Sequence, residues 1–289
     1  MITRQKVLLS ILREADGKAS RMQVTKWAFL LRHETDSRGG SAFYEFLPYK
    51  YGPFSFCLFQ ESSGFVQSGL LKEVDEKTWA LEPDGMAVAL ELDPLIQTEI
   101  RRVVHDPARQ SLSNLTAYVY DRYPWFTLNS DRDRRIERPI AKPAVYTAGY
   151  EGVSLDGFLN GLLRAGIQRI VDVRNNPVSR RYGFHKATLA RVARLVEIDY
   201  AHHPELGVPA EARQRLDAPG AYERLFRFYE SEVLEKQAGS VGAVAKLISE
   251  RPSVLLCREA DPACCHRSRL AACLQAATGL DVRHLEIAG

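Results

Sequence analysis

The stretch that decides the fold of the C-terminal half is Ser253-Val-Leu-Leu-Cys-Arg-Glu-Ala-Asp-Pro-Ala-Cys-Cys-His-Arg-Ser-Arg-Leu270. It opens with a short apolar run, Val254 to Leu256, which is typical of a parallel strand covered on both faces. Asp261-Pro262 then predicts a helix, with aspartate as N-cap and proline at the first helical position. Residues 264–267 would fall in its first turns. Ligands of open α/β sheets bind outside the carboxyl ends of the strands and at helix N-termini, so this segment is predicted to carry a site.

The remainder of the C-terminal half repeats the strand-then-helix pattern. Strands that alternate with helices predict a doubly wound, Rossmann-like parallel α/β domain. The predicted strands cover about residues 144–150, 169–174, 197–203, 253–257 and 281–287, and the predicted helices about residues 154–166, 188–195, 221–235, 241–250 and the segment after 261.

The N-terminal half has a different plan. Apolar residues at helical spacing fill 2–14, Ser20 would cap a second helix, and a third is expected over about 55–68. A strand at 69–74 and a hairpin partner at 77–83 follow. Three helices and a small β-ribbon are the plan of a winged-helix domain.

These patterns predict three parts. A mostly helical, winged-helix-like domain would cover residues 1–128, with mainly helices over 84–120. A charged, proline-containing linker would cover 129–143, and the α/β domain would cover 144–289.

The composition is that of a soluble globular protein, with 45% hydrophobic and 26% charged residues among 289. No apolar run approaches the roughly 20 residues of a membrane span, and the N-terminus lacks the apolar core of a signal peptide. We therefore expect a cytoplasmic protein without a membrane partner. Five cysteines, an odd number, argue against a secreted disulfide scaffold. The net charge of +3 does not establish a nucleic-acid partner, and the oligomeric state is not predicted.

Four separate motifs follow one another along the C-terminal half. They are Tyr146-Thr-Ala-Gly-Tyr-Glu-Gly152, Val171-Asp-Val-Arg-Asn-Asn-Pro177, His203-Pro-Glu-Leu-Gly207, and Leu256-Cys-Arg-Glu259 with Cys265-His-Arg-Ser268. On these motifs, residues of about 144–287 resemble the DUF488 family, whose function is undetermined. The resemblance implies a fold and a site but no reaction. The N-terminal half is more loosely similar to the winged-helix-like domains in front of such modules. Residues 46–55 are similar to Panacea-type antitoxin domains, which would fit a bacterial defence setting.

Asp172 and Arg174 alternate on a strand, so both side chains should point to one face and into the cleft. A carboxylate beside a guanidinium stays ionised, which suits orienting a water or a substrate hydroxyl. The pair could equally be a salt bridge that anchors the loop. On the neighbouring strand, Gly149 would let backbone approach a ligand and Tyr150 could stack on a base, although an ordinary turn explains this segment as well.

The loop after Arg174 interleaves basic and aromatic residues, a pattern that suits a phosphate backbone with stacked bases, or only a solvated loop. Following the third strand, His203 or Glu205 could act as a general acid or base, whereas His202 is expected to be structural. The spacing C-x6-C-C-H lacks the C-x2-C pair of structural zinc sites, so we predict no metal and no cofactor. Cys257 or Cys265 could be a thiolate nucleophile. The preferred interpretation is an anion or substrate site in which Glu259, His266 and Arg267 project towards Asp172.

Together these features favour an enzyme that acts on nucleic acid, with DNA preferred. The candidate reaction is hydrolysis of the N-glycosidic bond of a flipped, possibly modified base, with Asp172 activating water or stabilising charge. One alternative is a winged-helix regulator whose α/β domain senses a nucleotide-like ligand, and another is a cysteine-dependent small-molecule enzyme. The candidate catalytic residues are Asp172, Glu259, Glu205 and His266; the candidate substrate-binding residues are Gly149, Tyr150, Glu151, Arg174, Asn175, Arg181, Tyr182, Cys257 and Arg267; the candidate nucleic-acid-binding residues are Lys26, Lys50, Arg180 and Lys186.

Overall fold

The computed structural model describes residues 1–89, 92–213 and 220–287. The chain divides into two compact units, Met1–Glu137 and Arg138–Gly289, and the division lies inside the segment predicted as a linker. Residues 90–91, in a stretch predicted to be mainly helical, lie outside the described residues. None of the described helices is both long and apolar enough to cross a membrane.

The first unit is rich in helices and carries two small antiparallel sheets. One sheet has the order β1-β5-β4 and the other pairs β2 with β3. The elements are α1 (Thr3–Glu14), β1 (Lys18–Ser20), α2 (Arg21–Glu34), β2 (Leu47–Tyr49), β3 (Gly52–Phe54), α3 (Phe56–Gln67), β4 (Leu71–Asp75), β5 (Thr78–Leu81), α4 (Pro83–Val88), α5 (Pro94–Val104), η1 (Pro107–Arg109), α6 (Leu112–Arg122) and η2 (Pro124–Thr127).

Helix α2 begins where the sequence indicates. The hydroxyl of Ser20 accepts a hydrogen bond from the backbone N–H of Gln23 at 3.2 Å, and the Gln23 side chain accepts from the backbone N–H of Ser20. This reciprocal capping satisfies two donors that the first helical turn leaves without partners. The buried side chains of Phe29 and Trp79 help to fill the core of the unit, which holds all three tryptophans of the chain.

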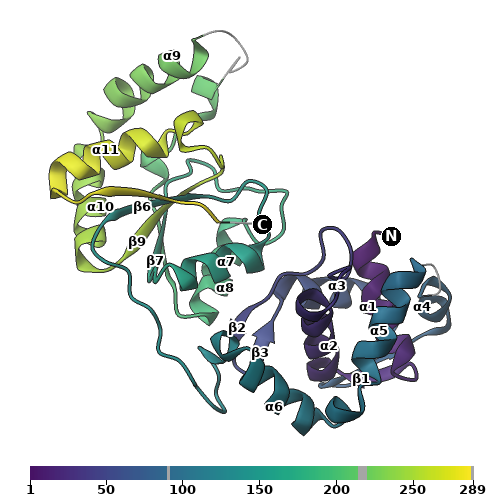
Figure 1. The fold of residues 1–289 in the computed structure, drawn as a ribbon. Coiled ribbons are helices and arrows are strands. Elements are labelled where there is room, and N and C mark those ends of the chain that lie inside the picture. Colours follow the sequence, from purple (N-terminus) through teal and green to yellow (C-terminus); the bar gives the residue numbers. More distant parts are fainter. Residues whose placement is uncertain (90–91, 214–219, 288–289) are drawn as a thin grey trace. The chain divides into compact units, whose positions relative to one another are not determined.

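The second unit is a five-stranded, wholly parallel sheet of order β10-β6-β9-β7-β8. Figure 1 shows α10 and α11 on one face of this sheet and α7 and α8 on the other, which confirms the predicted Rossmann-like class. The elements are β6 (Val145–Gly149), α7 (Leu155–Arg164), β7 (Arg169–Asp172), α8 (Lys186–Leu195), β8 (Asp199–His202), η3 (Pro204–Leu206), η4 (Ala210–Arg213), α9 (Ala221–Phe228), the π-helical η5 (Tyr229–Leu234), α10 (Ala238–Glu250), β9 (Ser253–Cys257), η6 (Pro262–Cys264), α11 (Arg267–Thr278) and β10 (Val282–Leu285).

The helix after β9 begins later than predicted. The Asp261 carboxylate accepts from the backbone N–H of Ala263 at 2.8 Å, but the turn it caps is the short 3₁₀ helix η6. Cys265 is extended, with φ −130° and ψ 134°, and α11 begins at Arg267. The prediction that residues 264–267 lie in the first turns of one helix is therefore wrong. The extended residue redirects the chain, so that Cys265 and His266 turn back towards β9.

Candidate functional site

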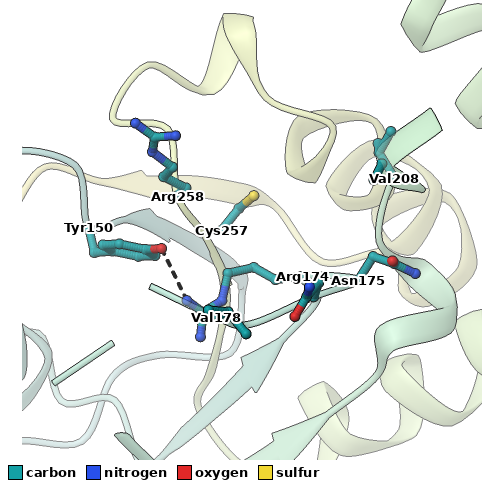
Figure 2. Close-up of a pocket in the computed structure, with 9 residues that line it drawn as sticks. Tyr150, Arg174, Asn175, Val178, Val208, Cys257 and Arg258 are labelled. Atoms are coloured by element: carbon teal, nitrogen blue, oxygen red, sulfur yellow. Dashed lines mark hydrogen bonds between the residues drawn. The ribbon is translucent and has the colours of Figure 1, made fainter. Parts of the chain in front are cut away.

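A cavity of about 190 Å³ opens at the carboxyl edge of the sheet, where β6, β9 and β7 end. We call it the carboxyl-edge cavity. Its position agrees with the expectation for open parallel sheets. Figure 2 shows side chains that follow β6 and β7, that end or follow β9, and that of Val208 around it. The polar residues that line it are Tyr150, Arg174, Asn175, Asn176, Cys257 and Arg258.

One wall of the cavity rests on a buried ion pair. The Arg174 guanidinium donates from Nε to Oδ1 of Asp172 at 2.8 Å and from Nη2 to Oδ2 at 2.5 Å. Tyr200 donates to the same Oδ2 at 2.6 Å, and the backbone N–H of Arg174 donates to Oδ1 at 3.1 Å. Burial alone would lower the pKa of Arg174, but the hydrogen bonds and charge of Asp172 raise it above its ordinary value. Burial and the same carboxylate raise the pKa of Tyr200.

Asp172 therefore does not project into the cleft as predicted. Its side chain is fully buried, both oxygens accept hydrogen bonds, and only Arg174 of the pair reaches the cavity. Strand β7 ends at Asp172, and the chain beyond it curls so that Arg174 folds back on its neighbour. Asp172 thus holds Arg174 charged and in place.

The Tyr150 ring is held on both its face and its hydroxyl. It stacks on Phe184 with 4.1 Å between ring centroids and 10° between planes, and its hydroxyl accepts from Arg174 Nη1 at 3.1 Å (Figure 2). The Arg174 guanidinium carbon lies 5.1 Å from the ring centroid. One face of the Tyr150 ring is therefore covered by Phe184 rather than left for a base, contrary to expectation.

Gly149 serves the loop after β9. A Cβ atom at this position would lie 1.8 Å from the carbonyl oxygen of Glu259, so only glycine lets that loop pass. The backbone N–H groups of Tyr150 and Glu151 both donate to the carbonyl of Arg258, at 3.1 and 2.9 Å. Glu151 itself is exposed and lies 3.7 Å from the Arg258 guanidinium. This segment positions the loop after β9, and that loop occupies the space beside Gly149 that was predicted for a ligand.

Two thiols, an imidazole and a carboxylate lie together beside the cavity, and we call them the thiol cluster (Cys257, Glu259, Cys265 and His266). Both Cys257 Sγ and Cys265 Sγ lie 3.1 Å from Oε2 of Glu259. His266 Nδ1 lies 3.7 Å from Cys257 Sγ and 4.0 Å from Cys265 Sγ. Burial, together with the hydrogen bond to Cys257, raises the pKa of the Cys265 thiol. Cys257, Cys265 and His266 are all buried, although Cys257 also lines the cavity.

Arg267, a predicted substrate-binding residue, is buried and is not among the residues that line the carboxyl-edge cavity. It is 1% exposed and donates to the backbone carbonyls of Glu259 and Ala260 at 2.5 and 2.8 Å, and to the Thr147 hydroxyl at 3.3 Å. Its guanidinium fastens the loop after β9, because it supplies the donors that the loop's carbonyls need. It does not project towards Asp172.

Glu205 lies apart from the residues that line the cavity. Its Oε1 is 3.0 Å from Nδ1 of His203. Burial would raise the pKa of Glu205, but hydrogen bonds from its own backbone N–H and from His203 lower it. His202 is bound to the backbone, with Nε2 at 2.9 Å from the carbonyl of Arg174. Glu205 was predicted to be a general acid or base in the cleft. Its carboxylate is held ionised and lies outside the residues that line the cavity.

The loop between β7 and α8 is exposed at its charged positions. Asn175 carries an exposed amide that donates to the carbonyl of Pro204 at 3.1 Å and also lines the cavity. Tyr182 is half-buried. The exposed basic residues of this loop and the start of α8 are Arg180, Arg181 and Lys186.

In the first unit, only one of the two predicted contact lysines is at the surface. Lys50 is exposed. Lys26 is 1% exposed, donates from Nζ to the carbonyl of Tyr51 at 2.7 Å, and lines an open pocket of about 520 Å³. Burial and the nearby charge of Arg132 lower its pKa to about 7. The prediction that Lys26 faces a duplex is wrong, because a core position was read as a surface position.

Three residues of the site were not predicted: Asn176, Tyr200 and Arg258. Arg258 could have been found, because it directly follows the last residue of β9 in the quoted stretch. Tyr200 carried no signal in the sequence, since its role depends on β8 pairing with β7 so that Tyr200 lies beside Ile170.

Residues 154–274 match the model of DUF488, a domain of unknown function. The match supports the resemblance carried by the motifs of the C-terminal unit and does not extend to the N-terminal unit. No curated protein and no solved structure matches the chain.

Proposed function

We propose that this protein is an enzyme that hydrolytically processes nucleic acid, with DNA preferred, and that the carboxyl-edge cavity takes one nucleotide unit. The candidate reaction is cleavage of the N-glycosidic bond of a flipped base, with or without a modification. The observation that carries the proposal is the donor set of the cavity. Arg258 is exposed, and Asn175, Asn176 and Arg174 supply further N–H groups, although most of those on Arg174 already donate to Asp172, Tyr150 and Phe184. The residues found to line the cavity include no carboxylate. Such a set suits an anionic ligand such as a phosphodiester.

The approach to the cavity supports the same ligand. The side chain of Arg258 is 66% exposed, and Arg180, Arg181 and Lys186 are exposed on the loop that starts at the cavity wall. Exposed cations beside a site raise the local concentration of a polyanion and speed its association. The volume of about 190 Å³ lies below the roughly 300–1,000 Å³ of most small-molecule pockets, so the cavity would take part or all of one nucleotide unit and no longer segment.

The structure changes the roles that we assign to the carboxylates. Asp172 is fully paired, so we assign it the positioning of Arg174. Glu259 lies next to the cavity, because its Oε2 is 3.1 Å from the Sγ of the cavity-lining Cys257. We therefore propose Glu259 as the group that accepts a proton from the attacking water. A base at that position contributes about 10²–10⁴-fold to such a step.

The N-terminal unit is proposed as a winged-helix-like DNA-binding module. Its element order and its antiparallel sheet β1-β5-β4 support this reading, because a wing is a β-hairpin that follows the third helix. The exposed Lys50 is a candidate contact. A cytoplasmic setting is part of the proposal, since the five cysteines are free thiols. A role in bacterial defence rests on the sequence resemblance of residues 46–55.

The test uses duplex and single-stranded oligonucleotides with normal or modified bases, incubated with the full chain and then treated with alkali. We expect strand breaks at abasic sites. Glu259→Gln should lower the rate by at least about 100-fold while oligonucleotide binding changes little. Arg258→Ala should weaken binding about tenfold, which corresponds to about 1.4 kcal/mol. Arg251→Ala is the matched control, because Arg251 precedes β9 at its other end and pairs only at the surface with Asp199.

Two results would reassign the function. Tight oligonucleotide binding without abasic sites from any substrate would favour the regulator that senses a nucleotide-like ligand. Alkylation of the cysteines that abolishes turnover of a small molecule, without nucleic-acid binding, would favour the cysteine-dependent enzyme. Equal loss of oligonucleotide binding in Arg258→Ala and Arg251→Ala would show that the carboxyl-edge cavity is not the binding site.

A further inference from the structure

The thiol cluster brings together three side-chain atoms that can bind a metal. The Sγ atoms of Cys257 and Cys265 and the Nδ1 atom of His266 all lie within 4.8 Å of one another, and all three residues are buried. The strand β9 ends on Cys257, and the extended backbone at Cys265 returns the chain to it. The linear pattern C-x6-C-C-H does not predict this convergence, because the seven residues 258–264 form a loop and the turn η6 between the two cysteines.

The separations fit a tetrahedral ion. Zinc–sulfur bonds of about 2.3 Å and zinc–nitrogen bonds of about 2.0 Å place tetrahedral ligand atoms about 3.5–3.8 Å apart. The His266 Nδ1 atom lies 3.7 Å from one Sγ and 4.0 Å from the other. A contraction of a few tenths of an ångström would therefore bring the two sulfur–nitrogen separations to those of a tetrahedral site, and the two sulfurs lie within 4.8 Å of each other.

The surroundings of the imidazole match those of a metal ligand. His266 Nε2 lies 3.2 Å from the backbone carbonyl oxygen of Val173. A carbonyl oxygen can only accept a hydrogen bond, so Nε2 carries the proton. That tautomer leaves Nδ1 with a free lone pair aimed at the two thiols. Ligating histidines commonly donate their other N–H to a backbone carbonyl in this way. Tyr229, from the π-helical turn η5, packs edge-on against the imidazole at 5.1 Å and holds the ring in place.

The carboxylate beside the thiols also suits a cation. Both thiols donate to Oε2 of Glu259 at 3.1 Å. Thiols bind metal as thiolates, so a bound ion would displace these two protons, and the Glu259 carboxylate is placed to accept one of them. Two sulfurs and one imidazole are the ligands that zinc prefers over magnesium or calcium.

We propose that Cys257, Cys265 and His266 bind one Zn²⁺ ion. Three protein ligands leave the fourth position open, which is the arrangement of catalytic rather than structural zinc sites. Cys257 also lines the carboxyl-edge cavity and Glu259 lies beside both thiols, so an ion held here would lie next to that cavity. The site goes beyond the proposed function, since zinc binding can be measured whether or not the protein processes nucleic acid.

The test measures zinc in the purified full chain after dialysis, by mass spectrometry of the metal, and the cobalt-substituted protein by absorption. We expect one zinc per chain and a thiolate-to-cobalt charge-transfer band. Cys257→Ser, Cys265→Ser and His266→Ala should each lower zinc affinity at least tenfold. Cys264→Ser is the matched control, because its Sγ lies near Asp261 rather than in the cluster, and it should bind zinc as the wild type does.

Reactivity of the unaltered protein gives a second readout that does not depend on a variant folding. Zinc should protect Cys257 and Cys265 from alkylation, and a chelator should expose them, while Cys264 reacts alike in both states. Zinc below one-tenth of an equivalent in wild-type protein refolded with zinc would overturn the proposal. So would equal zinc loss in Cys264→Ser and Cys265→Ser, or a disulfide between Cys257 and Cys265 under reducing conditions.

Discussion

Arg174 and Lys26 are both buried cations, one in each unit, and both were predicted to contact a ligand. Arg174 is paired with the Asp172 carboxylate, which raises its pKa and keeps its charge at the cavity wall. Lys26 has a backbone carbonyl as its acceptor and a neighbouring arginine charge, so burial lowers its pKa to about 7. Burial disfavours the charged form of both side chains, and only at Arg174 do the hydrogen bonds and charge of a carboxylate outweigh it. A guanidinium keeps its proton even without a partner, whereas a buried lysine amine can lose it. A carboxylate partner therefore decides how much a buried arginine destabilises the fold, and whether a buried lysine stays charged.

We expect the largest change in stability when the carboxylate partner of Arg174 is removed. Asp172→Asn leaves Arg174 charged and unpaired in the protein interior, which should destabilise the second unit by about 3–5 kcal/mol. Hydrogen exchange of peptides from β7 and β9 measures this, because the tryptophans lie only in the first unit. Asp199→Asn is the control, since its ion pair with Arg251 is exposed and contributes about 0–1 kcal/mol. Equal effects of the two substitutions would contradict the assignment.

The lowered pKa of Lys26 should make the stability of the first unit depend on pH. An unfolded lysine has a pKa near 10.4, so between about pH 7 and pH 10 the unfolded chain holds a proton that the native state lacks. The stability of the first unit should therefore rise with pH across this window. At about 1.36 kcal/mol for each pKa unit, the rise should be roughly 2–4 kcal/mol.

Lys26→Met supplies the matched measurement. Denaturant unfolding followed by tryptophan fluorescence at pH 6.5, 8 and 9.5 reports on the first unit, and the variant should lose the rise that the wild type shows. A wild-type slope that persists in the variant would mean that another group titrates and that Lys26 keeps its charge.

We expect the smallest change in stability when one hydrogen bond to the Asp172 carboxylate is removed. Tyr200→Phe removes one hydrogen bond to the charged Asp172, at 2.6 Å, and should cost about 1–2 kcal/mol. Tyr146→Phe removes a hydrogen bond to a neutral backbone carbonyl at 2.9 Å and should cost less, about 0.5–1 kcal/mol. Hydrogen exchange of the second unit compares the two, and a larger effect at Tyr146 would show that the Asp172 charge is not what Tyr200 stabilises.

The sequence predicted the parallel fold and the edge that carries the cavity, because apolar runs and turn signals are local. It did not predict which polar groups satisfy one another. Asp172 and Arg174 were correctly placed together, yet whether they face a ligand or each other depends on how the chain curls after β7. His266 was tied to the wrong partner, since the extended residue at Cys265 breaks the helical spacing on which that prediction relied.

Gly149 and Arg267 show the same limit from the backbone side. Both fix the loop after β9, one by leaving space for the carbonyl of Glu259 and the other by donating to it. A sequence marks such residues as small or charged, but it does not say that their partner is a main-chain carbonyl 8 or more positions away.

The most direct test of the central claim, that the carboxyl-edge cavity takes a nucleotide unit, is hydrogen exchange of the full chain with and without a bound oligonucleotide. We predict slower exchange in peptides spanning residues 174–182 and 257–260, together with peptides of the first unit. Protection confined to the first unit, with the carboxyl-edge peptides unchanged at saturating oligonucleotide, would contradict the account.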